Sequence, residues 1–114
     1  MTTSREIREG LQLQGSDERV AYRLDTSNWS LDPTTPGTPS VTSALIFTVT
    51  DLAGVITYTD VTITNMTGAT VVANQYITLP AVIVLVAGTK YRVEVKFTLE
   101  ANIFEAYAYI QGER

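Results

Sequence analysis

The sequence predicts an all-β domain, folded as an antiparallel β-sandwich of seven to nine short strands. Apolar and polar residues alternate along several segments, most regularly from Tyr91 to Leu99, and successive side chains of a strand point to opposite faces. Turn-forming residues separate these segments about every 8 to 12 residues. No segment outside the N-terminus has a convincing helical period.

Residues 91–99 are the predicted central strand, with one apolar and one polar face. Leu85 and Ala87–Thr89 precede it, and together with Tyr91 they are typical of the tyrosine corner of immunoglobulin-like and fibronectin type III-like sandwiches. In that corner a tyrosine hydroxyl bonds to upstream backbone. This interpretation predicts an immunoglobulin-like fold of Greek-key type. The alternative is that Tyr91 is an ordinary core aromatic.

Residues 104–110 form the predicted next strand, joined to the central strand by a four-residue turn at 100–103. Pairing Leu99 with Phe104 would set charged side chains beside tyrosines on the polar face. The expected cross-strand pairs are Lys96 with Tyr107 and Glu94 with Tyr109. The candidates for an interaction surface are Arg92, Glu94, Lys96, Tyr107 and Tyr109. An ordinary solvated strand is the alternative.

Residues 1–18 are predicted to form an extended or partly disordered arm or an edge strand, ahead of a sandwich domain at residues 19–114. One turn of helix with Ser4 as N-cap is the alternative, because Ile7 and Leu11 suit it. The alternating segment 20–25 predicts the first strand of the domain.

Residues 26–40 are the longest predicted loop and hold three of the four prolines. Proline cannot donate to a β-ladder, so no central strand is expected there. A long loop in a compact domain is usually functional or held in place by its own side chains. Trp29 is expected to hold this loop by covering one end of the core, and the alternative is a ligand-binding aromatic.

Residues 41–50 predict a strand with Leu45, Phe47 and Val49 on one face and Ile46 on the other. A turn at 51–54 follows. The later segments are shorter, and they comprise edge pieces at 55–58 and 61–66, strands at 69–73 and 76–79 joined by a bend at 74–75, and residues 82–86 after Pro80.

The chain has 114 residues, a formal net charge of −4, and neither cysteine nor histidine. These absences exclude disulfides, thiolate metal sites and histidine-dependent catalysis. The negative charge argues against binding nucleic acid through its phosphates. The polar N-terminus lacks a signal-peptide pattern, and the apolar stretch 81–87 is shorter than the about 20 residues of a membrane helix. We therefore expect no signal-directed secretion and no membrane partner.

Paired carboxylates are the remaining acid–base candidates, and Glu94 with Glu105 on adjacent strands is the nearest pair. Both are expected to be solvated, so no catalytic residue is predicted. No glycine-rich phosphate loop occurs, and no cofactor is expected. Four aspartates lie in or beside loops without the spacing of a calcium site, so they are expected to form turns rather than bind metal: Asp25, Asp32, Asp51 and Asp60.

Two runs, SDERVAYRLDTSNW at 16–29 and a longer one at 73–110, carry a family resemblance together with the Pro/Ser/Thr loop between them. They are similar to small uncharacterised structural-type proteins of bacteriophages and prophages, often encoded among virion structural genes. The resemblance covers most of residues 16–110 and is weakest over 1–15. It implies an immunoglobulin-like sandwich with a role in head or tail assembly, and it supplies no catalytic residue.

These observations together predict a non-enzymatic structural or interaction module, located in a virion or in the bacterial cytoplasm during assembly. Open sheet edges favour a homo-oligomer or assembly with other virion proteins, and no small-molecule ligand is expected. The alternative is a carbohydrate-binding module in which Trp29, Tyr107 and Tyr109 stack on sugar rings. A hydrolase ranks third, because the chain has no histidine.

Overall fold

The computed structural model describes residues 2–6, 11–31 and 34–114. Its all-β architecture is confirmed: the described part contains eleven strands, one short α-helix and one 3-10 turn. The count exceeds the seven to nine strands expected, because the N-terminal segment contributes two, β1 and β2. Neither helical segment of the described part is long and apolar enough to cross a membrane.

The larger sheet has six strands in the order β1-β11-β10-β4-β5, with β2 also paired to β11. Its strands are β1 (Thr2–Glu6), β2 (Gln12–Gly15), β4 (Ser40–Leu52), β5 (Val55–Asp60), β10 (Lys90–Leu99) and β11 (Asn102–Glu113). β1 and β2 run parallel to β11, whereas β10, β4 and β5 pair antiparallel. The two described strands of the N-terminal arm, β1 and β2, therefore lie along one edge of the sheet. Ser4, the N-cap of the alternative helix, lies in β1, and Ile7 lies outside the described residues.

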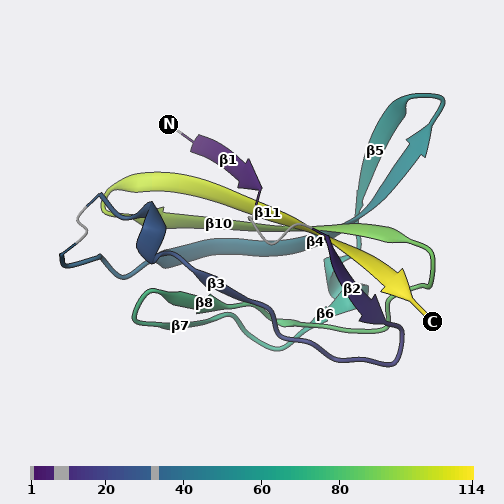
Figure 1. Cartoon of the computed structure of the whole chain (residues 1–114), viewed down its shortest axis with the longest axis horizontal. Helices are drawn as coiled ribbons and strands as arrows, with labels where there is room; N and C mark the ends of the chain where they lie inside the picture. The colour runs from purple at the N-terminus through teal and green to yellow at the C-terminus, as the bar shows by residue number, and fades with distance from the viewer. Residues whose placement is uncertain (1, 7–10, 32–33) are drawn as a thin grey trace.

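The smaller sheet orders its strands β3-β8-β7, and they lie along one side of the long strands in Figure 1. β6 and β9 form a further, two-stranded sheet. These elements and the helical turns are β3 (Arg23–Asp25), η1 (Ser27–Trp29), α1 (Thr62–Asn65), β6 (Met66–Thr67), β7 (Val71–Ala73), β8 (Tyr76–Thr78) and β9 (Ala81–Val82).

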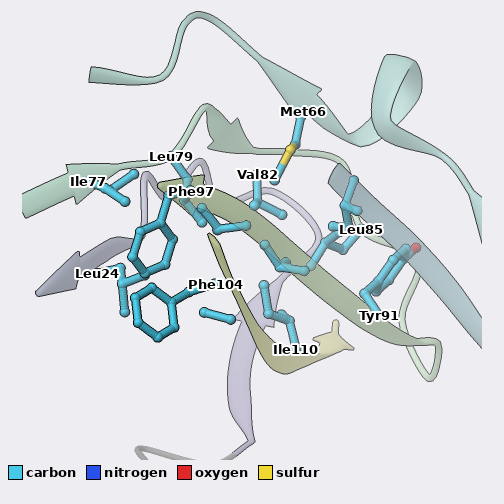
Figure 2. Packing of buried hydrophobic residues seen from close by; sticks show 14 of the residues in the cluster. Leu24, Met66, Ile77, Leu79, Val82, Leu85, Tyr91, Phe97, Phe104 and Ile110 are labelled. Carbon is cyan, nitrogen blue, oxygen red and sulfur yellow. The ribbon is translucent and has the colours of Figure 1, made fainter. Parts of the chain in front are cut away.

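The hydrophobic core lies between the two sheets. Leu24 and Ile77 of the smaller sheet face the rings of Phe97 and Phe104 from the larger one (Figure 2). Alternate residues of β10 are buried from Tyr91 to Leu99, which confirms the apolar face predicted for this strand. The even-numbered residues of β10 therefore point to the outside of the molecule.

Tyr91 is 1% exposed, and its hydroxyl accepts a hydrogen bond of 2.9 Å from the Val86 N–H. The bond to upstream backbone that was predicted for this tyrosine is thereby confirmed. The loop before β10 is also held on the end of β11, because the Gly88 N–H donates to the Gly112 carbonyl and the Gly112 N–H donates to the Thr89 carbonyl, both at 2.9 Å.

The predicted register of the last hairpin is wrong by two residues. Phe97 pairs with Phe104, and the turn contains only Glu100 and Ala101, whose φ angles are 52° and 66°. Two-residue turns with positive φ match the twist of the flanking strands, which favours this tighter connection. A shift of two leaves every side chain on its expected face. The pairs on the outer face are consequently Arg92 with Tyr109, Glu94 with Tyr107 and Lys96 with Glu105.

The strand predicted at 61–66 is also wrong, because α1 occupies most of this segment. The Asp60 carboxylate accepts hydrogen bonds from the Thr62 N–H at 2.9 Å and from its hydroxyl at 2.6 Å. The Thr62 hydroxyl oxygen in turn accepts the Ile46 N–H at 3.0 Å. These local bonds compete with a ladder and turn the chain, although threonine and isoleucine by themselves favour a strand.

β4 and β5 form a long hairpin whose tip rises away from the rest of the molecule (Figure 1). The strands are longer than predicted, and the turn is restricted to Ala53 and Gly54, with φ of 53° and 83°. All residues from 51 to 60 are exposed. The bend predicted at 74–75 is confirmed between β7 and β8, with Asn74 at a φ of 55°.

Candidate functional site

The outer face of the larger sheet carries a group of aromatic and charged side chains from three strands. We call it the outer-face cluster: Tyr58 of β5, Lys90, Arg92 and Glu94 of β10, and Tyr107 and Tyr109 of β11. The alternation of β10 and β11 turns these side chains away from the core, and the cross-strand register brings them together.

Arg92 is at the centre of the outer-face cluster. Its guanidinium carbon lies 3.9 Å from the ring centroid of Tyr107 and 5.2 Å from that of Tyr58. Its Nε is 2.7 Å from the Glu94 Oε2. A cation over an aromatic face is attracted by the ring quadrupole, so the rings and the carboxylate together hold the guanidinium in one position.

The two tyrosines of β11 contact each other edge to face, with ring centroids 5.8 Å apart. The Lys90 ammonium lies 4.2 Å from the centroid of Tyr109. Burial raises the pKa of Tyr109, Arg92 opposes this change, and the neighbouring Tyr58 adds to it. Burial by itself would lower the pKa of Arg92, but Tyr109 and Glu94 raise it above the ordinary value. Arg92 is therefore charged at every physiological pH.

β4 extends this surface with apolar side chains. Leu45, Phe47 and Val49 lie opposite Glu94, Arg92 and Lys90 of β10. They are half-buried, whereas Ile46, on the other face, is fully buried in the core. The predicted alternation of this strand is confirmed, and its apolar face is the outer one. These apolar side chains therefore lie between Tyr58 of β5 and the charged residues of β10, in the middle of the surface.

The structure brings together four of the predicted interaction residues: Arg92, Glu94, Tyr107 and Tyr109. Lys96 shares their face but lies one cross-strand pair further along, opposite Glu105. Sequence reasoning missed Lys90 and Tyr58. Lys90 lies two residues before Arg92 and therefore on the same face of the strand, so the alternation of the sequence could have identified it. Tyr58 is near Arg92 only because of the β4–β5 register, which pairs it with Val49.

Trp29 lies on a different surface from the tyrosines. Its ring is 5.3 Å from that of Phe97 and 5.5 Å from that of Phe104, and it packs half-buried against the core. Phe97 and Phe104 point inward, whereas Tyr107 points outward. The sheet therefore separates Trp29 from the outer-face cluster.

Glu100 holds the loop that follows Trp29. Its carboxylate accepts hydrogen bonds from the Ser30 hydroxyl at 2.5 Å, the Leu31 N–H at 2.8 Å and the Gly37 N–H at 3.0 Å. These bonds, that from Ser30 first, lower the pKa of Glu100 below its ordinary value. The tight turn between β10 and β11 thus anchors Ser30, Leu31 and Gly37.

We expect this loop to detach in acid. Because the pKa of Glu100 is lowered in the folded protein, its contribution is present above the ordinary glutamate pKa and is lost as the pH falls through the folded value. A titration from about pH 7 to about pH 3 should change the emission of Trp29, the only tryptophan. Glu100→Gln should remove this step. An unchanged titration in that variant would show that another group controls the loop.

The other acidic residues have local structural roles. The Asp25 carboxylate accepts the Ser27 N–H at 2.9 Å, and with Asp60 at α1 it confirms two of the predicted turn-forming aspartates. Asp51 lies in β4, and Asp32 lies outside the described residues. Within the described ranges, no three acidic side chains gather to hold a metal ion.

Comparisons with protein-family models, with curated proteins and with solved structures find no match to this chain.

Proposed function

We propose that this chain is a non-enzymatic interaction module of a phage-derived virion, and that it binds another virion protein through the outer-face cluster. The observation that carries the proposal is the Arg92 guanidinium held between Tyr107, Tyr58 and Glu94. Arginine and tyrosine are, with tryptophan, the residues enriched in the energetic centres of protein interfaces. A surface whose side chains are already fixed loses little entropy on binding.

The proposal includes an immunoglobulin-like sandwich, which three features support. The smaller sheet orders its strands β3-β8-β7, and the larger sheet contains β5-β4-β10-β11. These orders correspond to B-E-D and C′-C-F-G of the immunoglobulin arrangement. The hydrogen bond between the Tyr91 hydroxyl and the Val86 N–H has the form of the tyrosine corner.

The proposed location in a virion rests on the resemblance of residues 16–110 to phage structural-type proteins.

The carbohydrate-binding alternative gains no such support. Sugar rings would need Trp29 and the tyrosines on one surface, and the larger sheet lies between them. Arg92 and Lys90 already cover the rings of Tyr107 and Tyr109.

A binding experiment with a matched control tests the proposal. The purified chain is presented to the separated proteins of the particle, and the doubly substituted variant Arg92→Ala/Tyr107→Ala is compared with Arg23→Ala/Tyr76→Ala. The control removes a similar arginine–tyrosine pair, with 4.4 Å between guanidinium carbon and ring centroid, from the smaller sheet. We expect the first variant to lose about 2 kcal/mol or more, about thirtyfold in affinity, and the control to bind normally. Equal loss in both variants, or no particle protein bound, would contradict the proposal.

A further inference from the structure

Among the residues that the structure describes, β5 forms an open edge of the larger sheet. It is last in the strand order and pairs with β4, whereas β1 and β2 cover the edge of β11 at the other side. All six residues of β5 are exposed, and the hairpin projects from the body (Figure 1). An open edge presents a row of backbone N–H and C=O groups that pair with another extended strand.

The hairpin geometry identifies which residues of β5 present those groups. Leu52 and Val55 flank the two-residue turn and form a hydrogen-bonded pair. Hydrogen-bonded and non-bonded pairs then alternate, and the pattern continues to Val61, whose N–H donates to the Ile46 carbonyl at 3.0 Å. Ile56, Tyr58 and Asp60 therefore direct their peptide groups to the open side.

The edge lacks the features by which sheets normally avoid further pairing. Protected edges carry lysine, proline or a β-bulge. The segment Val55–Thr59 reads VITYT, and its register with β4 is continuous. Val55, Ile56 and Tyr58 are 65%, 55% and 45% exposed. A strand of this composition left open is prone to association.

We infer that the free edge of β5 pairs antiparallel with β5 of a second copy of this chain. The two copies are related by a two-fold axis that passes between their Thr57 residues. Each copy contributes the backbone groups of Ile56 and Tyr58. The larger sheets of the two copies become one continuous sheet, and the outer-face clusters lie on the same side of it.

The second copy is favoured as the partner because the strand is complementary to itself in this register. Ile56 of one copy lies opposite Tyr58 of the other, and Thr57 lies opposite Thr57. Aromatic–β-branched and threonine–threonine pairs are both stabilising across strands. Asp60 falls opposite Gly54, so the two aspartates do not face each other, whereas a register centred on Tyr58 sets Asp60 against Ile56. Closed two-fold dimers are the commonest symmetric assembly.

The inference goes beyond the proposed function, because it concerns the edge of β5 and a second copy of the chain. The two can fail separately: Arg92→Ala/Tyr107→Ala should leave this dimer intact, and a substitution on the edge should leave the monomer able to bind a virion protein.

Single cysteines test the register, because the natural chain contains none. In Thr57→Cys, the two cysteines face each other in a non-hydrogen-bonded pair, about 4.5 Å apart between Cα atoms, which is within disulfide range. In Thr59→Cys, at another exposed residue of the same strand, the two cysteines are about 13 Å apart. Under mild oxidation we expect covalent dimer to form several-fold faster for Thr57→Cys. Equal rates, or a faster reaction for Thr59→Cys, would overturn the inference.

A second measurement does not depend on cysteine chemistry. Light scattering across a dilution series should show the natural chain shifting from monomer to dimer, and Ile56→Lys should move the midpoint to at least about tenfold higher concentration. Ile56 is exposed, so this variant should fold normally. A natural chain that is monomeric at every concentration, or an unchanged midpoint in Ile56→Lys, would refute the dimer.

Discussion

Replacing Phe97 with alanine is expected to lower the free energy of unfolding by about 4 kcal/mol. Phe97 is 0% exposed, and its ring contacts those of Trp29 and Phe104, at 5.3 Å and 5.7 Å between centroids. Truncation removes the buried ring and leaves a cavity that its neighbours fill only in part. Domains of this size have about 5 to 15 kcal/mol of stability in total, so the substitution should remove a large fraction of it.

Chemical denaturation followed by Trp29 fluorescence measures this loss. Thr98→Ala is the matched control, because Thr98 is the next residue of β10 and points to the opposite face. We expect a change of about 1 kcal/mol or less, since the strand loses only a β-branched side chain from its outer face. Phe97→Leu should lose less than Phe97→Ala, since it leaves a smaller void. If Phe97→Ala lost no more than the control, the core would not be where the structure places it.

Replacing Gly112 with alanine is expected to cost about 3 kcal/mol. A Cβ at this position would lie 2.2 Å from the Val86 carbonyl oxygen and 3.0 Å from its carbonyl carbon. Both are backbone atoms, and their loop is held by the hydrogen bonds of Gly88, Thr89 and Tyr91. Relief of the overlap must therefore break at least part of the contact between β11 and the tyrosine corner.

Measuring the melting temperatures of Gly112→Ala and of the control variant Gly15→Ala tests this expectation. The three atoms nearest to an added methyl at Gly15 all belong to the Glu18 side chain, with Oε1 at 3.0 Å. This side chain accepts an exposed hydrogen bond from the Gly15 N–H, and its flexible end can shift because the loss of that bond costs little. We expect a much smaller fall in melting temperature for Gly15→Ala than for Gly112→Ala. Equal falls would indicate a general cost of losing glycine in place of the specific overlap with Val86.

The residues of the candidate site could be predicted in part. The alternation of β10 places Arg92 and Glu94 on the polar face, and the same reasoning applied to β11 places Tyr107 and Tyr109 there. Which of them touch depends on register, and the expected register was wrong because the turn at Glu100 has two residues in place of four. A turn type depends on φ angles that non-glycine residues adopt only when the flanking strands favour them.

The sequence by itself determined the all-β class and the inward face of β10, because a period of two is a local property of the chain. The tertiary structure alone decided which face of β4 is covered, since Leu45 and Ile46 are equally apolar and only the position of the smaller sheet buries the second. It also placed Tyr58 over Arg92 and left the edge of β5 open, because pairing between strands is set by contacts between distant parts of the chain.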